Sequence, residues 1–564
     1  MILSAMSFLV LLIKYLIFYI YLYFSGKSLF MIINYFRKKE STEKYILLTR
    51  VEFLYPLIGI IYVGNILFLL NTFFPLNTIF VNFILFLIIT PSVSKSLINK
   101  NIIKVVENKN LFSAFIYILI PSILVISTFD INFNYDAGYY HLLHQNWLRS
   151  SNLIIGMVNI FWPLGMSSIY EYISAILWFD TSFVLLHFLN LYFIHFFYLF
   201  ISDNLINSKN NILRNVSVFM LIYSLIDNFG VGGGRNGFLY IQGVGKQDIT
   251  VGVLFFYLSI IILLKIKEKN ISQTELIILS FIIFFIYQIK VSGVLIFYLY
   301  AILIFTLFKE NKIKFNTIFL LHSPILIFGI LWLLKSIYTT GCLIYPVNFT
   351  CYEGFDWYVK GSTIEFEYIT KSASLAFDNS IPFLEWARVK GSFEYRSQVF
   401  TNYVASLIIL YLIKVIFFYK NKLSFSFSLI ISSFIISNFA YLIFFGPIPR
   451  YAVGLCMVSI GMLGFYSGEL KYKIKDIAKY SLLFVSVFFL VRSTAYLALL
   501  NNENLRLFDP RTSYEINTEI GFKEFNENWV EPLDGDQCWS NIKCTNALSD
   551  IVFVNKGIFK VAYK

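Results

Sequence analysis

Long apolar stretches recur along almost the whole chain, and they restrict its fold more than any other feature. A helix of about 20 apolar residues crosses the ~30 Å hydrocarbon core of a bilayer. The sequence therefore predicts an all-α polytopic membrane protein with about 12–14 transmembrane helices. Lys14 lies inside the first stretch, so 15–36 is an alternative first helix. The candidate spans lie near 5–24, 52–71, 78–94, 112–128, 181–201, 215–227, 249–264, 274–289, 292–308, 316–337, 403–419, 424–445, 451–467 and 479–499.

Composition supports this fold class. Hydrophobic residues make up 58% of the 564 residues and charged residues 14%, and the mean hydropathy is +0.71. A soluble chain carries roughly 25% charged residues, and a disordered chain has low hydrophobicity. The net charge of +12 could indicate nucleic-acid binding. However, no basic run lies within a soluble segment, so we expect no nucleic-acid partner and assign the excess charge to the membrane topology.

The distribution of Lys and Arg predicts the orientation. Alternate connections, from 25–51 to 469–479, hold 24 basic residues, whereas the short connections between them hold five. Basic residues remain on the cytoplasmic side. No cleavage pattern follows the first stretch, which we expect to stay in the membrane. The predicted organisation is 1–128 (helices), 129–180 (first large outer loop), 181–337 (helices with an outer Gly-rich loop at 228–248), 338–402 (cysteine-bearing outer loop), 403–499 (helices) and 500–564 (outer C-terminal cap).

The five cysteines agree with this orientation. Cys342 and Cys351 lie in one predicted outer segment, and Cys538 and Cys544 lie in another. Disulfides persist on that side of the membrane, so we expect two disulfides. A metal site is the alternative, although no CxxC motif or neighbouring histidine supports it. Cys456 lies inside a span, where a buried thiol usually serves packing.

The first large outer loop carries one group of candidate residues. Asp136 lies in the aromatic segment NYDAGYYHLLHQNWLR, and a partly desolvated carboxylate suits general-base catalysis. A helix N-cap is the alternative for this residue. His141 and His144 share a helix face and could bind a divalent metal with Asp136, or simply face lipid headgroups. The apolar stretch 164–179 contains Glu171, and the topology makes it a re-entrant or interfacial helix.

Basic residues gather at the other predicted outer connections. The Gly-rich segment 228–248 contains Arg235, Lys246 and Asp248 but no G-K-[ST] motif, so it is either a flexible connection or a phosphate site. In GPIPRY (446–451), Arg450 is either a membrane anchor or a bidentate phosphate ligand. Lys290 and Lys335 end spans on the same side. Together these residues predict a cationic rim beside a carboxylate, as transfer of a sugar from a polyprenyl phosphate requires.

Several stretches resemble those of GT-C-type polytopic membrane glycosyltransferases. They are most similar to a group of large bacterial membrane proteins associated with surface-polysaccharide genes. The matching stretches are DAGYYHLLHQNW (136–147), GMVNIFWPLGMSS (156–168), GKQD (245–248), TGCLIYPVNFTC (340–351), GPIPRY (446–451) and DQCWSNIKCT (536–545).

This resemblance implies a GT-C-like fold and a site at the outer face of a bacterial cytoplasmic membrane. It implies Asp136 as the base, with Arg450 and Lys246 holding phosphate and Asp248 and Tyr451 supporting them. Arg235 is added to the phosphate ligands as a member of the cationic rim, and His141 and His144 are added to the supporting residues. The chain departs from the family in two ways: four spans precede the first large loop, and Asp136 has no acidic neighbour. The expected partners are the bilayer, a polyprenyl-phosphate donor and a glycan or lipid-linked acceptor. The sequence identifies no cofactor, and a divalent metal stays open.

Three other functions stay open. A polysaccharide polymerase or ligase would use similar outer basic residues, and a non-catalytic subunit of an assembly complex would need no site at all. A transporter or lipid flippase would place ionisable residues along a path through the membrane. Only Lys14, Lys414 and Arg492 lie within spans, whereas the polar residues concentrate at one surface. We therefore expect glycosyl transfer.

Overall fold

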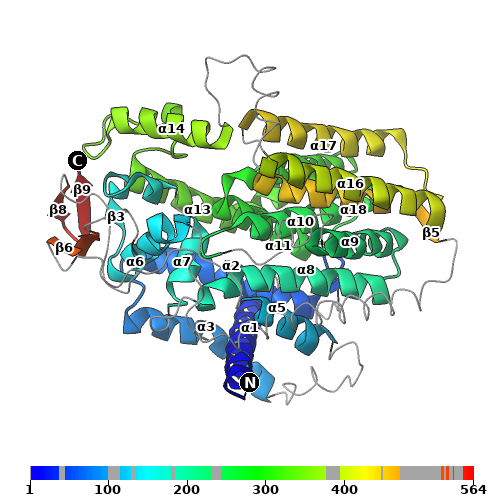
Figure 1. The fold of residues 1–564 in the computed structure, drawn as a ribbon, viewed down its shortest axis with the longest axis horizontal. Coiled ribbons are helices and arrows are strands. Elements are labelled where there is room, and N and C mark those ends of the chain that lie inside the picture. The colour runs from blue at the N-terminus through cyan, green and yellow to red at the C-terminus, as the bar shows by residue number, and fades with distance from the viewer. Residues whose placement is uncertain are drawn as a thin grey trace.

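The structure is a computed structural model, and its described part is mainly helical (Figure 1). It describes residues 2–36, 45–98, 115–128, 135–166, 168–178, 184–229, 243–375, 394–445, 449–470, 522–525, 529–532, 538 and 551–564. The helices are α1 (Ile2–Phe36), α2 (Val51–Asn71), α3 (Ile79–Ile98), α5 (Ile120–Thr128), α6 (Leu142–Ser150), α7 (Ile169–Ala175), α8 (Phe188–Asn207), α9 (Asn211–Phe229), α10 (Asp248–Glu268), α11 (Gln273–Ile289), α12 (Ile296–Lys309), α13 (Phe315–Thr340), α14 (Lys360–Leu375), α16 (Glu394–Phe417), α17 (Phe425–Phe445) and α18 (Val453–Phe465).

Short turns and strands connect and extend these helices. Single helical turns cover Phe115–Leu119, Ala137–His141, Met157–Asn159, Trp162–Gly165, Val184–His187, Val291–Gly293, Asn348–Thr350 and Pro449–Ala452. The strands are β1 (Tyr45–Ile46), β2 (Thr49–Arg50), β3 (Ile154–Ile155), β4 (Phe418–Lys420), β5 (Ser467–Leu470), β6 (Phe522–Phe525), β7 (Trp529–Pro532), β8 (Val552–Lys556) and β9 (Phe559–Tyr563).

The number and length of the apolar helices would allow the chain to cross a membrane several times. Within the described ranges, eight helices are long and apolar enough to span a bilayer, and four more apolar helices are shorter. The two alternatives for the first span are parts of one continuous 35-residue helix, α1. The last candidate, 479–499, lies outside the described residues. Stretch 164–179 contains only the seven-residue helix α7 and a short turn, too little to span a bilayer.

Two helices form the centre of the bundle. The apolar segments of α8 and α10 are completely buried within the protein, and α10 packs closely against α18. By contrast, few residues of α3, α12, α13 and α17 are buried within the protein, and large apolar side chains such as Leu320 and Ile330 on α13 are exposed. Exposed apolar area on this scale is unfavourable in water but suits lipid. The outer helices are therefore compatible with a bilayer around them.

The two ends of the bundle differ in what they carry. In Figure 1, α6, α7, β3, α14, β8 and β9 lie at one end, which we call the cap end, and β5 lies at the other. At the connections predicted to be cytoplasmic, basic side chains pair with carboxylates: Arg50 with Asp203 at 2.8 Å and Lys265 with Glu275 at 2.8 Å. The segments predicted to lie outside the cytoplasm therefore meet at one end of the molecule.

The C-terminal segment joins the cap end through a small sheet. Strand β9 pairs in parallel with β3 and antiparallel with β8. Beneath the sheet, Trp147, Ile154 and Ala562 belong to one buried apolar cluster with Cys538. The backbone N–H of Cys538 also donates to Gly138 O at 2.9 Å. These contacts hold residues 538 and 551–564 against the first large loop, in keeping with a C-terminal cap.

Helices α1 and α2 cross with almost no space between their backbones. A Cβ added at Gly59 would overlap the carbonyl oxygen of Leu22, and one at Gly26 would overlap that of Tyr55. Neither carbonyl can move away without displacing its helix. Small residues allow such close approach between membrane helices, and this pair positions α2 against α7 near the site described below.

We expect Gly59→Ala to destabilise the protein by about 1–3 kcal/mol, because overpacking forces the two backbones apart. The measurement is the melting temperature of the purified protein in detergent. Gly361→Ala is the matched control, since Gly361 lies in α14 with no atom near its missing Cβ. An equal effect of both substitutions would contradict a role for the tight crossing.

Candidate functional site

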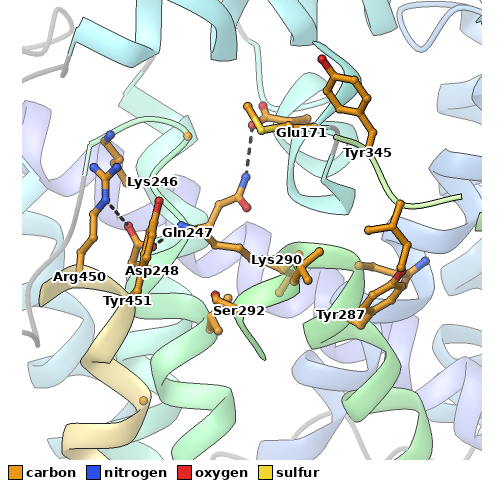
Figure 2. A pocket seen from close by; sticks show the side chains of 18 of the residues that line it. Glu171, Lys246, Gln247, Asp248, Tyr287, Lys290, Ser292, Tyr345, Arg450 and Tyr451 are labelled. Atoms are coloured by element: carbon orange, nitrogen blue, oxygen red, sulfur yellow. Dashed lines mark hydrogen bonds and ion pairs between the residues drawn. The ribbon is translucent and has the colours of Figure 1, made fainter. Parts of the chain in front are cut away.

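A cavity of about 420 Å³ opens at the cap end, between α10, α11, α13, α17 and α18. Four basic side chains line it, but only two carboxylates do, so the described lining carries an excess of positive charge. In Figure 2, Lys246, Asp248, Arg450 and Tyr451 lie together on one side of the view and Tyr345 lies on the other. The charged lining residues are Lys246, Lys290, Lys335, Arg450, Glu171 and Asp248.

Asp248 organises the basic residues on one side of the cavity. It occupies the first turn of α10, where a carboxylate is favoured by the helix dipole, and its side chain is 3% exposed. Lys290, which ends α11, donates to Asp248 Oδ1 at 2.5 Å, and Arg450 Nε lies 3.9 Å from Oδ2. The Lys290 ammonium also lies 4.2 Å from the centre of the Tyr451 ring. One buried carboxylate thus gathers two cations from distant segments.

Asp136 and Lys246 form a second ion pair beside the first. Burial alone would raise the pKa of Asp136, but the charge and hydrogen bond of Lys246 bring that pKa below its usual value. Burial and the nearby Arg450 charge lower the pKa of Lys246, and Asp136 opposes this shift. The pairing keeps both groups charged. We call Lys246, Lys290 and Arg450, with their partners Asp136 and Asp248, the cationic clamp.

The backbone before Lys246 is fixed by Gly245 and Asn190. Gly245 has a φ of +78°, and a Cβ there would overlap the ring of His141. The side-chain amide of Asn190 donates to Lys246 O at 3.0 Å. A glycine is therefore required for the GKQD segment to lie directly on the first large loop. This contact joins two stretches that are about a hundred residues apart.

Glu171 is the centre of a buried hydrogen-bond network. Its carboxylate accepts from His141 Nδ1 at 2.6 Å, Gln145 Nε2 at 2.7 Å and Gln247 Nε2 at 3.4 Å. The indole N–H of Trp178 donates to Gln145 Oε1 at 2.7 Å, which fixes the orientation of the Gln145 amide. Because the carboxylate can only accept, His141 carries its proton on Nδ1. In this tautomer the lone pair of the imidazole is on Nε2.

The structure brings most of the sequence-predicted residues together. His141, His144, Lys246, Asp248, Arg450 and Tyr451 all line the cavity, and Asp136 joins them through Lys246. Arg235 lies outside the described residues. Lys290 and Lys335, expected on the rim, line the cavity as well.

Glu171 was not among the predicted site residues, nor were Gln145 and Gln247. The available signal was a single carboxylate in an otherwise apolar stretch, which indicates a partnered group. Its partners come from two separate segments, the first large loop and the residues just before α10, so sequence alone does not identify them.

The predicted disulfide between Cys342 and Cys351 is present, with an S–S distance of 2.04 Å. The loop that it closes carries Tyr345, whose ring packs at Gly165 and lines the cavity. Cys538 is also disulfide-bonded, and Cys544 lies outside the described residues. Cys456 is buried in α18, as expected for a packing thiol.

A metal centre finds no donor set in the described ranges, where no three His, Cys, Asp or Glu side chains are grouped as ligands. Asp136 pairs with Lys246, and Glu171 is occupied by His141 and two amides. Of the residues considered as ligands of a divalent ion, Asp136 therefore pairs with a lysine, and His141 pairs with Glu171.

Comparison with known proteins gives one match. No curated protein and no solved structure matches the chain. A family model described as a domain of unknown function (DUF8201) matches residues 6–457, which include the helical bundle and nearly all of the cavity lining. Since this match covers well over half of the 564 residues, the chain belongs to the DUF8201 family.

Proposed function

We propose that this protein is a membrane glycosyltransferase that moves a sugar from a polyprenyl-phosphate-linked donor to a glycan or lipid-linked acceptor. The observation that carries this proposal is the cavity, which joins a cationic clamp to an apolar wall. A lipid-linked phosphate needs both features next to each other. The sequence resemblance to GT-C-type enzymes points to the same chemistry.

The apolar wall extends from the clamp along the helices. Asp248 and Phe255 both line the cavity, and they are seven residues apart on α10, or about 10 Å along its axis. Leu442 of α17 and Leu455 of α18 continue this wall. Because most residues of α17 are not fully buried within the protein, a lipid tail can reach the cavity along this helix. A soluble phosphate ester would need no such apolar extension.

The clamp suits a phosphate leaving group. Negative charge develops on the phosphate oxygen as the bond to the sugar breaks, and fixed cations stabilise that charge. Arg450 can hold two phosphate oxygens at once, while Lys246 and Lys290 act as compact point charges. Asp136 and Asp248 hold these cations in place before the substrate binds, which avoids reorganisation during the reaction.

We assign the general base to His141, oriented by Glu171. The acceptor hydroxyl oxygen forms a bond to the anomeric carbon, and the bond from that carbon to the phosphate oxygen breaks. The hydroxyl proton passes to His141 Nε2, and the polyprenyl phosphate leaves with the bonding electrons. Glu171, 2.6 Å from Nδ1, stabilises the imidazolium that forms. Asp136 is less suited to this role because its ion pair with Lys246 lowers its pKa.

We place the cap end outside the cytoplasm, in a bacterial cytoplasmic membrane with the cavity facing the periplasm or exterior. The basic connections at the opposite end support this orientation. The Cys342–Cys351 disulfide supports it independently, because disulfides persist outside the reducing cytoplasm.

Removing a clamp cation should lower turnover strongly. We expect Arg450→Gln and Lys246→Gln each to reduce transfer of labelled sugar from polyprenyl phosphate by about 10²–10³-fold, as loss of a donor at a developing negative charge does. The assay is turnover by the purified protein with a panel of polyprenyl-phosphate sugars. Lys360→Gln is the control, because Lys360 is exposed and pairs with Glu353 away from the cavity. Full activity in both clamp variants would contradict the phosphate role.

The choice of base makes a separate prediction. We expect His141→Gln and Glu171→Gln to lower kcat by about 10²–10⁴-fold, the range of general-base catalysis. Asp136→Asn should act mainly on KM, because it loosens Lys246 without removing the base. Measurement of kcat and KM for all three variants separates the two assignments. A larger loss of kcat in Asp136→Asn than in His141→Gln would return the base to Asp136.

A further inference from the structure

A second group of polar side chains lines the same cavity, apart from the cationic clamp. It consists of His144 on α6, Lys335 near the end of α13, and Tyr345 in the disulfide loop. All three are almost fully buried, with exposed fractions of 3%, 6% and 8%, and all three line the cavity. We call these three side chains the second subsite.

Two polar atoms of the second subsite lack hydrogen-bond partners within the described part of the chain, and its lysine lacks a paired carboxylate there. His144 Nε2 and Tyr345 OH make no hydrogen bond there. The Lys335 ammonium lies 4.9 Å from the centre of the Trp332 ring and 5.6 Å from that of Tyr172, with no described carboxylate paired to it. By contrast, Lys246 and Lys290 are each paired with an aspartate. Buried polar groups normally have hydrogen-bond partners. The missing partners of these groups therefore point to a ligand.

The positions of these side chains are fixed by their surroundings. The Cys342–Cys351 disulfide closes the loop that carries Tyr345, and the ring of Tyr345 packs directly at Gly165. Lys335 is enclosed by aromatic rings, and His144 lies on the same helical face as His141. Donors fixed in this way lose little entropy when a ligand binds.

We propose that the second subsite binds the carboxylate of an acidic sugar, such as a uronic acid. This subsite has one cation, Lys335, with no carboxylate paired to it in the described part of the chain, so a ligand with one carboxylate supplies the missing partner. In the clamp, by contrast, two aspartates already pair with the cations. Burial and the neighbouring Lys335 charge lower the pKa of His144 well below its ordinary value, so His144 adds a neutral polar group rather than a second charge. A phosphate dianion would lack a second cation here.

This inference names the substrate class of the proposed glycosyl transfer and rests on that function for its role. The carboxylate can be carried by the donor sugar or by the acceptor. The binding test below needs no turnover, so failure of the transfer proposal and failure of the subsite proposal give different results.

The test uses the full-length protein in phosphatidylcholine nanodiscs, with binding followed by saturation-transfer NMR. Methyl glucuronide, methyl glucoside and inorganic phosphate are the probes. We expect methyl glucuronide to bind at least about tenfold more tightly than methyl glucoside, since a charge-assisted bond is made only by the acid. Equal binding of the two sugars would overturn the proposal. It would also be overturned if inorganic phosphate displaced the bound methyl glucuronide at a lower concentration than methyl glucoside does.

Variants locate this binding at the second subsite. Lys335→Met should abolish the preference for the glucuronide while raising the melting temperature of the ligand-free protein, because it removes an unpaired buried charge. Lys246→Met should keep the preference, and Lys360→Met should change neither property. A purely structural lysine would instead lower the melting temperature when replaced. A preference that survives Lys335→Met would overturn the proposal.

Two smaller substitutions test the neutral donors without altering the charge. His144→Gln and Tyr345→Phe should each weaken glucuronide binding severalfold and leave methyl glucoside binding unchanged. Unchanged glucuronide binding in both would overturn the proposed subsite. In turnover assays, uronate-bearing donors and uronate-bearing acceptors are compared separately with their neutral counterparts. If Lys335→Met removes the higher rate of the uronate-bearing donor, the donor carries the carboxylate; if it removes that of the acceptor, the acceptor does.

Discussion

Burial of charge at the ends of apolar helices is the constraint on which this site depends. A charged group removed from water is costly unless an opposite charge or several hydrogen bonds replace the water. Asp248 meets this requirement at the start of α10 with Lys290 and Arg450, and Glu171 meets it with one imidazole and two amides. These partners come from different parts of the chain. Satisfying each carboxylate therefore also assembles the cavity wall.

The same requirement explains why the first large loop is so heavily supported. Gly245 lies against His141, the N–H of Cys538 bonds to Gly138, and strand β9 pairs with β3. Each contact attaches this loop to a remote segment. A loop that carries buried polar groups has no water to replace a displaced partner, so its geometry must be fixed by neighbouring elements. The C-terminal residues pack against this loop through one buried apolar cluster, and the disulfide loop packs against it through another.

Sequence analysis identified the helices and the clamp for a shared physical reason. Hydrophobic length is a local property, so the positions of α2, α8 and α10 follow directly from the printed sequence. Alternating spans then place Lys246, Asp248 and Arg450 at the same end, which brings them near one another before any contact is known. The partner of each residue is not local. The pairing of Lys246 with Asp136, 110 residues earlier, and of His141 with Glu171 depends on how the loop folds back.

The cavity also shows how a stability rule can be used to find function. Most buried charges at the cap end have partners, so the usual cost of burial is offset within the protein. Lys335, His144 and Tyr345 depart from this pattern, and all three line the same cavity. A single unsatisfied group can reflect local packing, whereas three in the lining of one cavity favour a common explanation. A bound anion would give these groups the partner that they lack. In the clamp, aspartates already provide that partner for the buried cations.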